Sequence, residues 1–162
     1  MAKKPVATEA HRVDATRVAL TGIAGGEPLD DVLARLRSSV DFAFPFPGDV
    51  FVEVAADALE LAGATRATPV SLSDATETYL PEWTVSGNTA HQKSRAAIDA
   101  AIALHAGIAV DFGAVAGWWQ VQDFAFYAFQ TAVIMIRLAA ATTGRPAESI
   151  CTEIAARHHL QL

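Results

Sequence analysis

Apolar residues dominate one stretch near the carboxyl end of this chain, WWQVQDFAFYAFQTAVIMIRLAAA at positions 118–141. Three of its polar residues, Asp123, Gln130 and Arg137, recur at intervals of seven. On a helix with about 3.6 residues per turn, this spacing keeps the three side chains within one narrow stripe. The pattern predicts a buried helix over about 120–141 with a single polar stripe, around which the other helices pack.

The rest of the chain shows the shorter apolar repeats of helices that bury one face. Thr8 and Asp49 are predicted N-caps, and Thr89 begins a capping box with Gln92. The predicted helices span residues 8–23, 28–40, 49–61, 74–80, 89–106 and 147–159, with 111–117 as a short helix or a kinked lead-in. We therefore expect an all-α, single-domain bundle of about six or seven helices over residues 8–162, preceded by a flexible tail at 1–7.

A proline-rich loop, DFAFPFPGD, carries three phenylalanines at alternate positions, Phe42, Phe44 and Phe46. Pro45 and Pro47 exclude a regular helix here. Rings in such a rigid loop either plug the bundle or meet a partner protein. The plug is favoured, because an exposed apolar patch of this size is unusual on a monomer. A partner surface, including self-association of the chain, is the alternative.

Acidic residues are concentrated in the first half of the chain. The net charge is -6, and residues 27–82 hold eleven acidic residues against three arginines, a local balance of -8. This half does not suit nucleic acid, because phosphate binding needs clustered Lys and Arg, but it suits a partner protein with a basic surface. Glu53, Asp57 and Glu60 share one side of a predicted helix, either as that interface or as an ordinary solvated face. No metal site is expected, because the Glu-x-x-His pairs of di-metal bundles are absent.

The helix predicted over 89–106 carries two histidines on or beside its inner face. His91 and His105 are separated by about 21 Å along the axis, so they cannot share one ligand atom. Each is either a core residue with satisfied hydrogen bonds or an acid–base group of a pocket. We expect such a pocket between helices 89–106 and 120–141. Its candidate lining is His91, Arg95, His105, Asp123, Tyr127, Gln130 and Arg137, with Arg95 as an anion anchor.

The segment 137–160 has the spacing of a helix-turn-helix in Ala140, Gly144 and Ile150. Its second helix, however, presents acidic residues such as Glu153, whereas base reading needs Arg, Lys, Asn or Gln at the start of that helix. The same spacing describes any tight turn between two helices. DNA binding is therefore a third hypothesis, and nucleic acid is not the expected partner.

Several functional classes lack their signatures in this sequence. Cys151 is the single cysteine and can form no internal disulfide, which favours a reducing compartment and a small buried thiol. No apolar run follows the amino-terminal lysines, and the run at 118–141, broken by Gln130 and Arg137, falls short of the about 20 residues of a membrane span. We expect a cytoplasmic protein. Phosphate loops, nucleophile elbows and metal-binding spacings are absent, so no cofactor or metal is predicted.

Two classes of function fit these observations. The first is a protein–protein interaction module, such as an adaptor, inhibitor or regulatory subunit, that uses the acidic half or the loop at 42–46. The second is a small-molecule-binding protein or enzyme with the interhelical pocket, in which His91 or His105 is the acid–base group. Missing motifs do not exclude the second class, because catalytic groups are assembled in space and not in sequence.

Overall fold

The computed structural model describes residues 4–36, 42–63, 88–116 and 121–162, apart from the side chains of 88–92, 94, 116, 121 and 122. These residues form seven α-helices and no strand, which confirms the all-α prediction. The helices are α1 (Glu9–Ala24), α2 (Leu29–Leu36), α3 (Gly48–Leu61), α5 (Asn88–His105), α6 (Phe112–Ala116), α7 (Val121–Thr143) and α8 (Ala147–Arg157). The helix predicted at 74–80 and the capping box of Thr89 and Gln92 lie outside this description.

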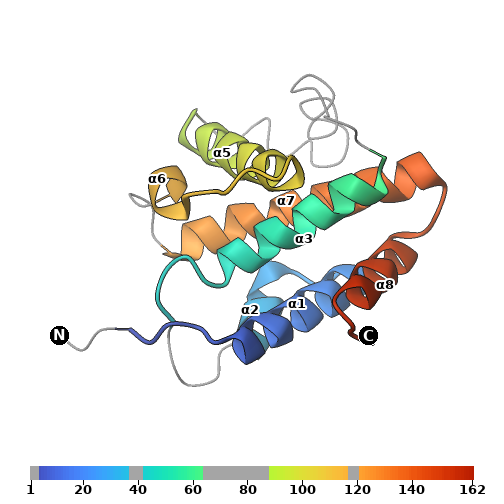
Figure 1. Cartoon of the computed structure of the whole chain (residues 1–162), viewed down its shortest axis with the longest axis horizontal. Helices are drawn as coiled ribbons and strands as arrows, with labels where there is room; N and C mark the ends of the chain where they lie inside the picture. Colours follow the sequence, from blue (N-terminus) through green and yellow to red (C-terminus); the bar gives the residue numbers. More distant parts are fainter. Residues whose placement is uncertain (1–3, 37–41, 64–87, 117–120) are drawn as a thin grey trace.

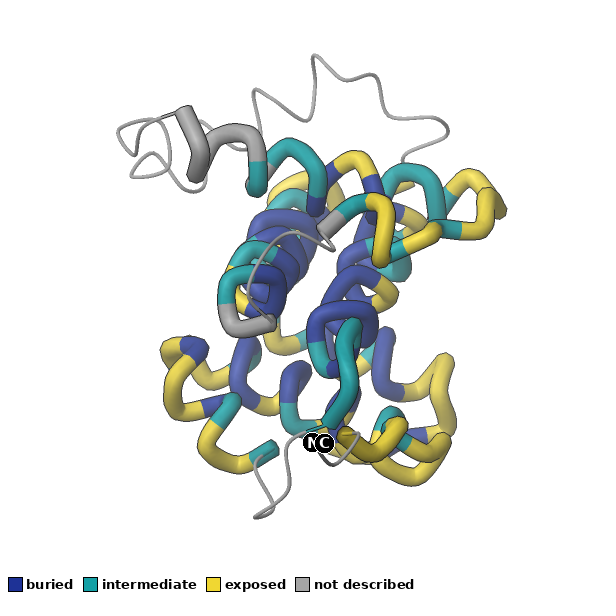
Figure 2. Tube along the Cα trace, turned by 90° about the vertical axis from the view of Figure 1, so that its left-hand side faces the viewer, coloured by how far each residue is buried: buried dark blue, intermediate teal, exposed yellow. Residues whose placement is uncertain are grey.

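The helices pack in layers, as Figures 1 and 2 show. The middle layer consists of α3 and α7, which lie side by side. On one side of this pair, α5 packs against both helices, with α6 next to it. On the other side, α1 and α8 pack against each other and against α3, and α2 follows α1. The main apolar core lies between these layers.

The centre of the bundle is a pair of helices and not a single one. The prediction of a buried apolar helix at about 120–141 is confirmed, since α7 buries residues such as Phe124 and Ile134 completely. α3 was expected to bury one face, but it buries nine of its 14 residues. The two helices approach closely at Gly48, which has no side chain. A Cβ at Gly48 would overlap the ring of Phe124.

The phenylalanine loop packs inside the molecule. Phe46 is 6% exposed, and Phe42 and Phe44 are half-buried. The ring centroid of Phe44 lies 5.4 Å from that of Phe124 on α7, a normal distance for packed aromatic rings. The backbone of the loop also donates a hydrogen bond of 2.8 Å to the carbonyl of Pro5, in the expected tail. This is the plug arrangement that the sequence favours.

Two predicted N-caps have different outcomes. Thr8 caps α1, since its hydroxyl accepts a hydrogen bond of 3.4 Å from the backbone N–H of His11. The prediction that Asp49 caps the next helix is wrong, because α3 begins at Gly48 and its N-cap is Pro47. Asp49 lies inside the first turn of α3 and points toward α1. Its pairing there, with Arg12, depends on tertiary structure that a local capping rule does not contain.

The apolar length of α7 exceeds the expectation from sequence. Over Asp123–Thr143 this helix is long and apolar enough to cross a membrane, judged by length and composition alone. Within the bundle, 56% of its most apolar window is buried. The central helix of a folded core passes the same test, so this one helix does not establish a membrane span.

Candidate functional site

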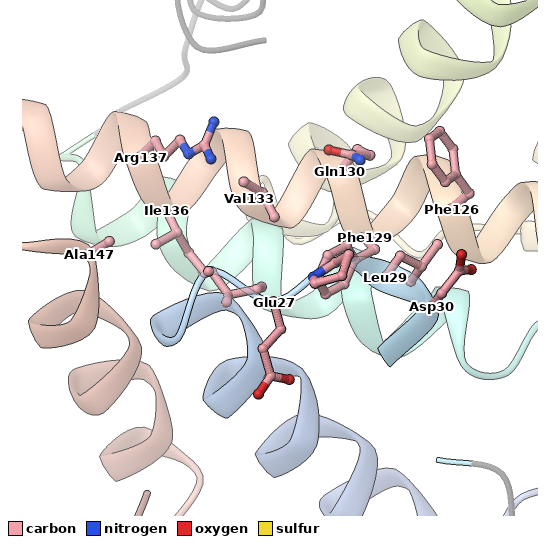
Figure 3. Close-up of a pocket in the computed structure, with 13 residues that line it drawn as sticks. Glu27, Leu29, Asp30, Phe126, Phe129, Gln130, Val133, Ile136, Arg137 and Ala147 are labelled. Carbon is pink, nitrogen blue, oxygen red and sulfur yellow. The ribbon is translucent and has the colours of Figure 1, made fainter. Parts of the chain in front are cut away.

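A pocket of about 360 Å³ lies along α7 in the described part of the chain (Figure 3). One wall comes from α7, and the loop between α1 and α2 together with the start of α2 forms the other. Ala147, at the start of α8, lies at one end. Sites for small molecules in proteins typically have volumes of about 300–1,000 Å³. The pocket is therefore large enough for a small organic molecule.

The wall on α7 is one apolar face of the helix. Phe126, Phe129, Val133 and Ile136 are spaced three and four residues apart, which places them on the same side. Phe129 and Ile136 are almost fully buried and form the inner part of this wall. Val133 is half-buried and Phe126 is 39% exposed. Apolar surface thus extends from the core into the open part of the pocket.

Hydrogen bonds hold the opposite wall in place. Gly26 turns the chain after α1 with a φ of 69°, a conformation that suits glycine. The backbone N–H of Glu27 then donates to the carbonyl of Gly22 at 2.8 Å. The carboxylate of Glu27 accepts hydrogen bonds from both terminal nitrogens of Arg35, one of them at 3.0 Å. These contacts fasten the loop to α1 and to α2.

Polar side chains lie at the rim of the pocket. Gln130 and Arg137 come from α7, and Asp30 comes from the first turn of α2. In Figure 3, Asp30 lies toward the end marked by Phe126, and Arg137 lies toward the end marked by Ala147. The pocket thus has a carboxylate at one end and a guanidinium at the other.

The polar stripe of α7 is divided between this pocket and α5. Gln130 and Arg137 line the pocket, whereas Asp123 accepts a hydrogen bond of 2.8 Å from the ammonium of Lys93 on α5. That ammonium also lies 6.0 Å from the ring centroid of Tyr127. The side chain of Lys93 is only 13% exposed. Between α5 and α7, the predicted polar residues therefore contribute to packing and an ion pair.

Arg95 and His105, the candidates on α5 whose side chains are described, do not line this pocket. Arg95 pairs with Asp99 on its own helix at 3.3 Å, and His105 is half-buried at the end of α5. The side chain of His91 lies outside the description. Among the described side chains of the lining expected between helices 89–106 and 120–141, Gln130 and Arg137 are the two that line this pocket.

Sequence reasoning did not single out several residues of this pocket. Phe126 and Val133 carry a usable signal, because their spacing with Phe129 and Ile136 defines a second apolar face beside the polar stripe. Asp30 carries no such signal, since its position at the rim depends on how the loop after α1 packs.

The carboxylates of the candidate interface on α3 have partners within the protein. These contacts are Glu53 with Arg12 at 2.8 Å, Asp57 with His158 at 2.7 Å and Glu60 with Arg157 at 2.8 Å. The partners come from α1, α8 and the residue after α8. The acidic side of α3 therefore helps to dock both outer helices, and its two arginine partners offset much of its charge.

Arg12 lies between two carboxylates of α3, Asp49 and Glu53. Asp49 is 6% exposed; its Oδ2 accepts a hydrogen bond from Arg12, while its Oδ1 is buried and has no hydrogen-bond partner among the described residues. Burial raises the pKa of Glu53, although the charge of Arg12 opposes the effect. Burial lowers the pKa of Arg12, but the hydrogen bond and charge of Asp49 and the nearby glutamates raise it overall. The cluster ties α1 to α3.

The basic side chain in the turn between α7 and α8, Arg145, binds residues of α8. Arg145 donates a hydrogen bond of 2.9 Å to the hydroxyl of Ser149 and pairs with Glu153, both on α8. A recognition helix would instead present such a side chain to base edges. Nothing in this turn therefore adds to the DNA-binding hypothesis.

Cys151 has the environment of a structural residue. It is 0% exposed, and burial raises the pKa of its thiol to about 12. A thiol of that pKa holds almost no thiolate at neutral pH, which makes it a poor nucleophile. Among the described residues, no three His, Cys, Asp or Glu side chains gather as a metal site would require.

The chain matches no protein-family model, no curated protein and no solved structure.

Proposed function

We propose that this protein binds a small, mainly apolar molecule in the pocket along α7. The observation that supports the proposal best is Phe126, a large apolar side chain that is 39% exposed at the open part of the pocket. Side chains of this kind are usually buried, and Val133 and Phe129 continue the same apolar face inward. A ligand seated there removes this face from water.

Apolar burial supplies most of the expected affinity. Burying apolar surface contributes about 25 cal/mol per Å², so a ligand that removes about 150 Å² of apolar surface from water, its own and that of the pocket together, gains about 4 kcal/mol. This corresponds to a dissociation constant of about 1 mM. A hydrogen bond to the amide of Gln130 adds about 1 kcal/mol. Simple probes should therefore bind in the range of about 0.1–1 mM, and the natural ligand more tightly.

The polar groups of the pocket suit recognition of a ligand. They comprise the amide of Gln130, the guanidinium of Arg137 and the carboxylate of Asp30. An amide and charged groups of this kind select a ligand by hydrogen bonding and charge. The proposal is accordingly of binding and not of a particular reaction.

Titration calorimetry with octanol tests the proposal. We expect a single saturable site per chain with a negative heat-capacity change, which is the marker of apolar burial. The Val133→Trp variant should lose this binding, because the indole occupies the part of the pocket beside the apolar wall of α7. Val18→Trp is the matched control, since Val18 is also a half-buried valine of a packed helix but does not line the pocket.

Both tryptophan variants must first show the circular dichroism and cooperative unfolding of the parent protein. Binding that disappears in Val133→Trp and persists in Val18→Trp supports the pocket as the site. Binding that is absent from the parent protein, or equal in the two variants, contradicts the proposal.

A second candidate function is a protein–protein interaction through the acidic side of α3. The side chains of Glu53 and Glu60 favour it, because they remain 48% and 62% exposed although each has a cationic partner. Glu60→Lys should abolish co-purification with a basic partner from the native host. Glu148→Lys, at an exposed glutamate of α8, should leave it intact. Equal co-purification with both variants would remove this candidate.

A further inference from the structure

We infer that the ligand of this pocket carries a positive charge, such as a protonated amine, at the end near Asp30 and Phe126. The inference rests on the proposed function, since it names the chemical class of ligand for the same site. It follows from the distribution of charge along the pocket and from the partners that each charged group already has.

The two charged ends of the pocket are far apart. Phe126 and Arg137 are eleven residues apart on α7, a separation of about 16 Å at a rise of about 1.5 Å per residue. Asp30 lies toward the Phe126 end (Figure 3). A small ligand that fills the pocket beside Phe126 therefore meets the carboxylate of Asp30, and its charged group does not reach Arg137.

The charged groups of the lining differ in their availability. Glu27 gives both carboxylate oxygens to Arg35, so that pair is close to neutral. Arg137 already has a partner within the protein. Asp30 is exposed and makes no hydrogen bond or ion pair with the residues that the structure describes. Of these groups, Asp30 is the one whose charge is available to a ligand.

The helix dipole does not reverse this preference. The amino-terminal end of α2 is equivalent to about half a positive elementary charge, which by itself favours anions. Asp30 and Asp31 both lie in the first turn of α2, and their two negative charges outweigh the dipole. Phe126 adds an exposed aromatic ring at the same end, and the face of such a ring attracts cations.

Three probes with the same apolar chain and different head groups test the inference: octylammonium, octanol and octanoate. They are titrated by calorimetry at low ionic strength and below the concentrations at which they form micelles. Octylammonium should bind about fivefold more tightly than octanol, the preference expected of a partly exposed ion pair. Octanoate should bind more weakly than octanol.

Asp30→Asn should reduce octylammonium binding to the level of octanol. Asp31→Asn is a matched control, because it removes the same charge from the same turn of α2 at a residue that does not line the pocket. The Asp31→Asn control should keep most of the preference for octylammonium over octanol. This combination, with octanol binding unchanged in both variants, supports a cationic ligand held by Asp30.

The other outcomes overturn the inference in distinguishable ways. Equal binding of the three probes, or tightest binding of octanoate, refutes the cationic ligand while the pocket itself stands. If Asp30→Asn and Asp31→Asn lose the preference for octylammonium over octanol equally, the negative charge of the protein as a whole, and not Asp30, selects the probe. Failure of all three probes to bind refutes the proposed function as well.

Discussion

Replacing Arg12 by methionine should destabilise the protein far more than the same change at Arg17 on the same helix. Arg17 pairs with Asp14 at 3.7 Å, and their side chains are 47% and 58% exposed. A pair of this kind contributes about 0–1 kcal/mol. Arg12 pairs with Asp49, whose side chain is 9% exposed. Removing Arg12 leaves a carboxylate buried without a cation, which typically costs about 3–5 kcal/mol.

The expected loss for Arg12→Met is about 3 kcal/mol, at the lower end of that range, because the Arg12 side chain is itself 27% exposed. Urea unfolding measures it as a lower midpoint with an unchanged m-value. For a domain of this size, the melting temperature should fall by about 6–12 °C. Adding Asp49→Asn should restore part of the loss, since the uncompensated charge disappears. Equal losses for Arg12→Met and Arg17→Met, or no recovery in the double variant, would refute the reasoning.

Three further predictions concern packing, thiol reactivity and pH. Gly48→Ala should lower the free energy of unfolding by about 2 kcal/mol in urea titrations, because the added Cβ overlaps the ring of Phe124; a change below about 0.5 kcal/mol contradicts the close packing of α3 on α7. Cys151 should react with a thiol reagent only after unfolding, because burial raises its pKa to about 12; rapid labelling of the folded protein would contradict this. In the folded protein the pKa of Glu53 lies above its ordinary value of 4.5. The protonated side chain therefore stabilises the fold at low pH, and this contribution is lost as the pH rises through the raised pKa. Glu53→Gln should flatten this part of the stability profile as the pH rises above about 4.5, and an unchanged profile would show that another group causes it.

Local patterns in the sequence predict most of the described helices, because each pattern and its helix involve the same neighbouring residues. Thr8 is an example, since the cap and the N–H that it binds are three residues apart. The central position of α3 is not predictable in this way. Its buried carboxylate, Asp49, pairs with Arg12, and its exposed carboxylate Glu60 pairs with Arg157. These partners lie 37 and 97 residues away along the chain.

The pocket shows the same division between local and tertiary information. The polar stripe predicts Gln130 and Arg137 as lining of a pocket against helix 89–106, whereas in the structure both line the pocket between α7 and the loop after α1. The stripe cannot tell which neighbouring helix each residue faces, and Asp123 turns out to bind α5. Similarly, Asp30 and Asp31 are equivalent as sequence, and only the packing of α2 places one of them at the rim.

Methyl NMR during an octanol titration measures most directly whether the pocket along α7 holds a ligand. The methyl groups of Leu29, Val133 and Ile136 line the pocket and should shift together and saturate at one dissociation constant. Ile134 and Ile154 are 0% exposed and do not line the pocket, so the NMR resonances of their methyl groups should not shift. Absence of shifts at the three lining residues, or shifts of equal size at all five, would contradict a ligand site in this pocket.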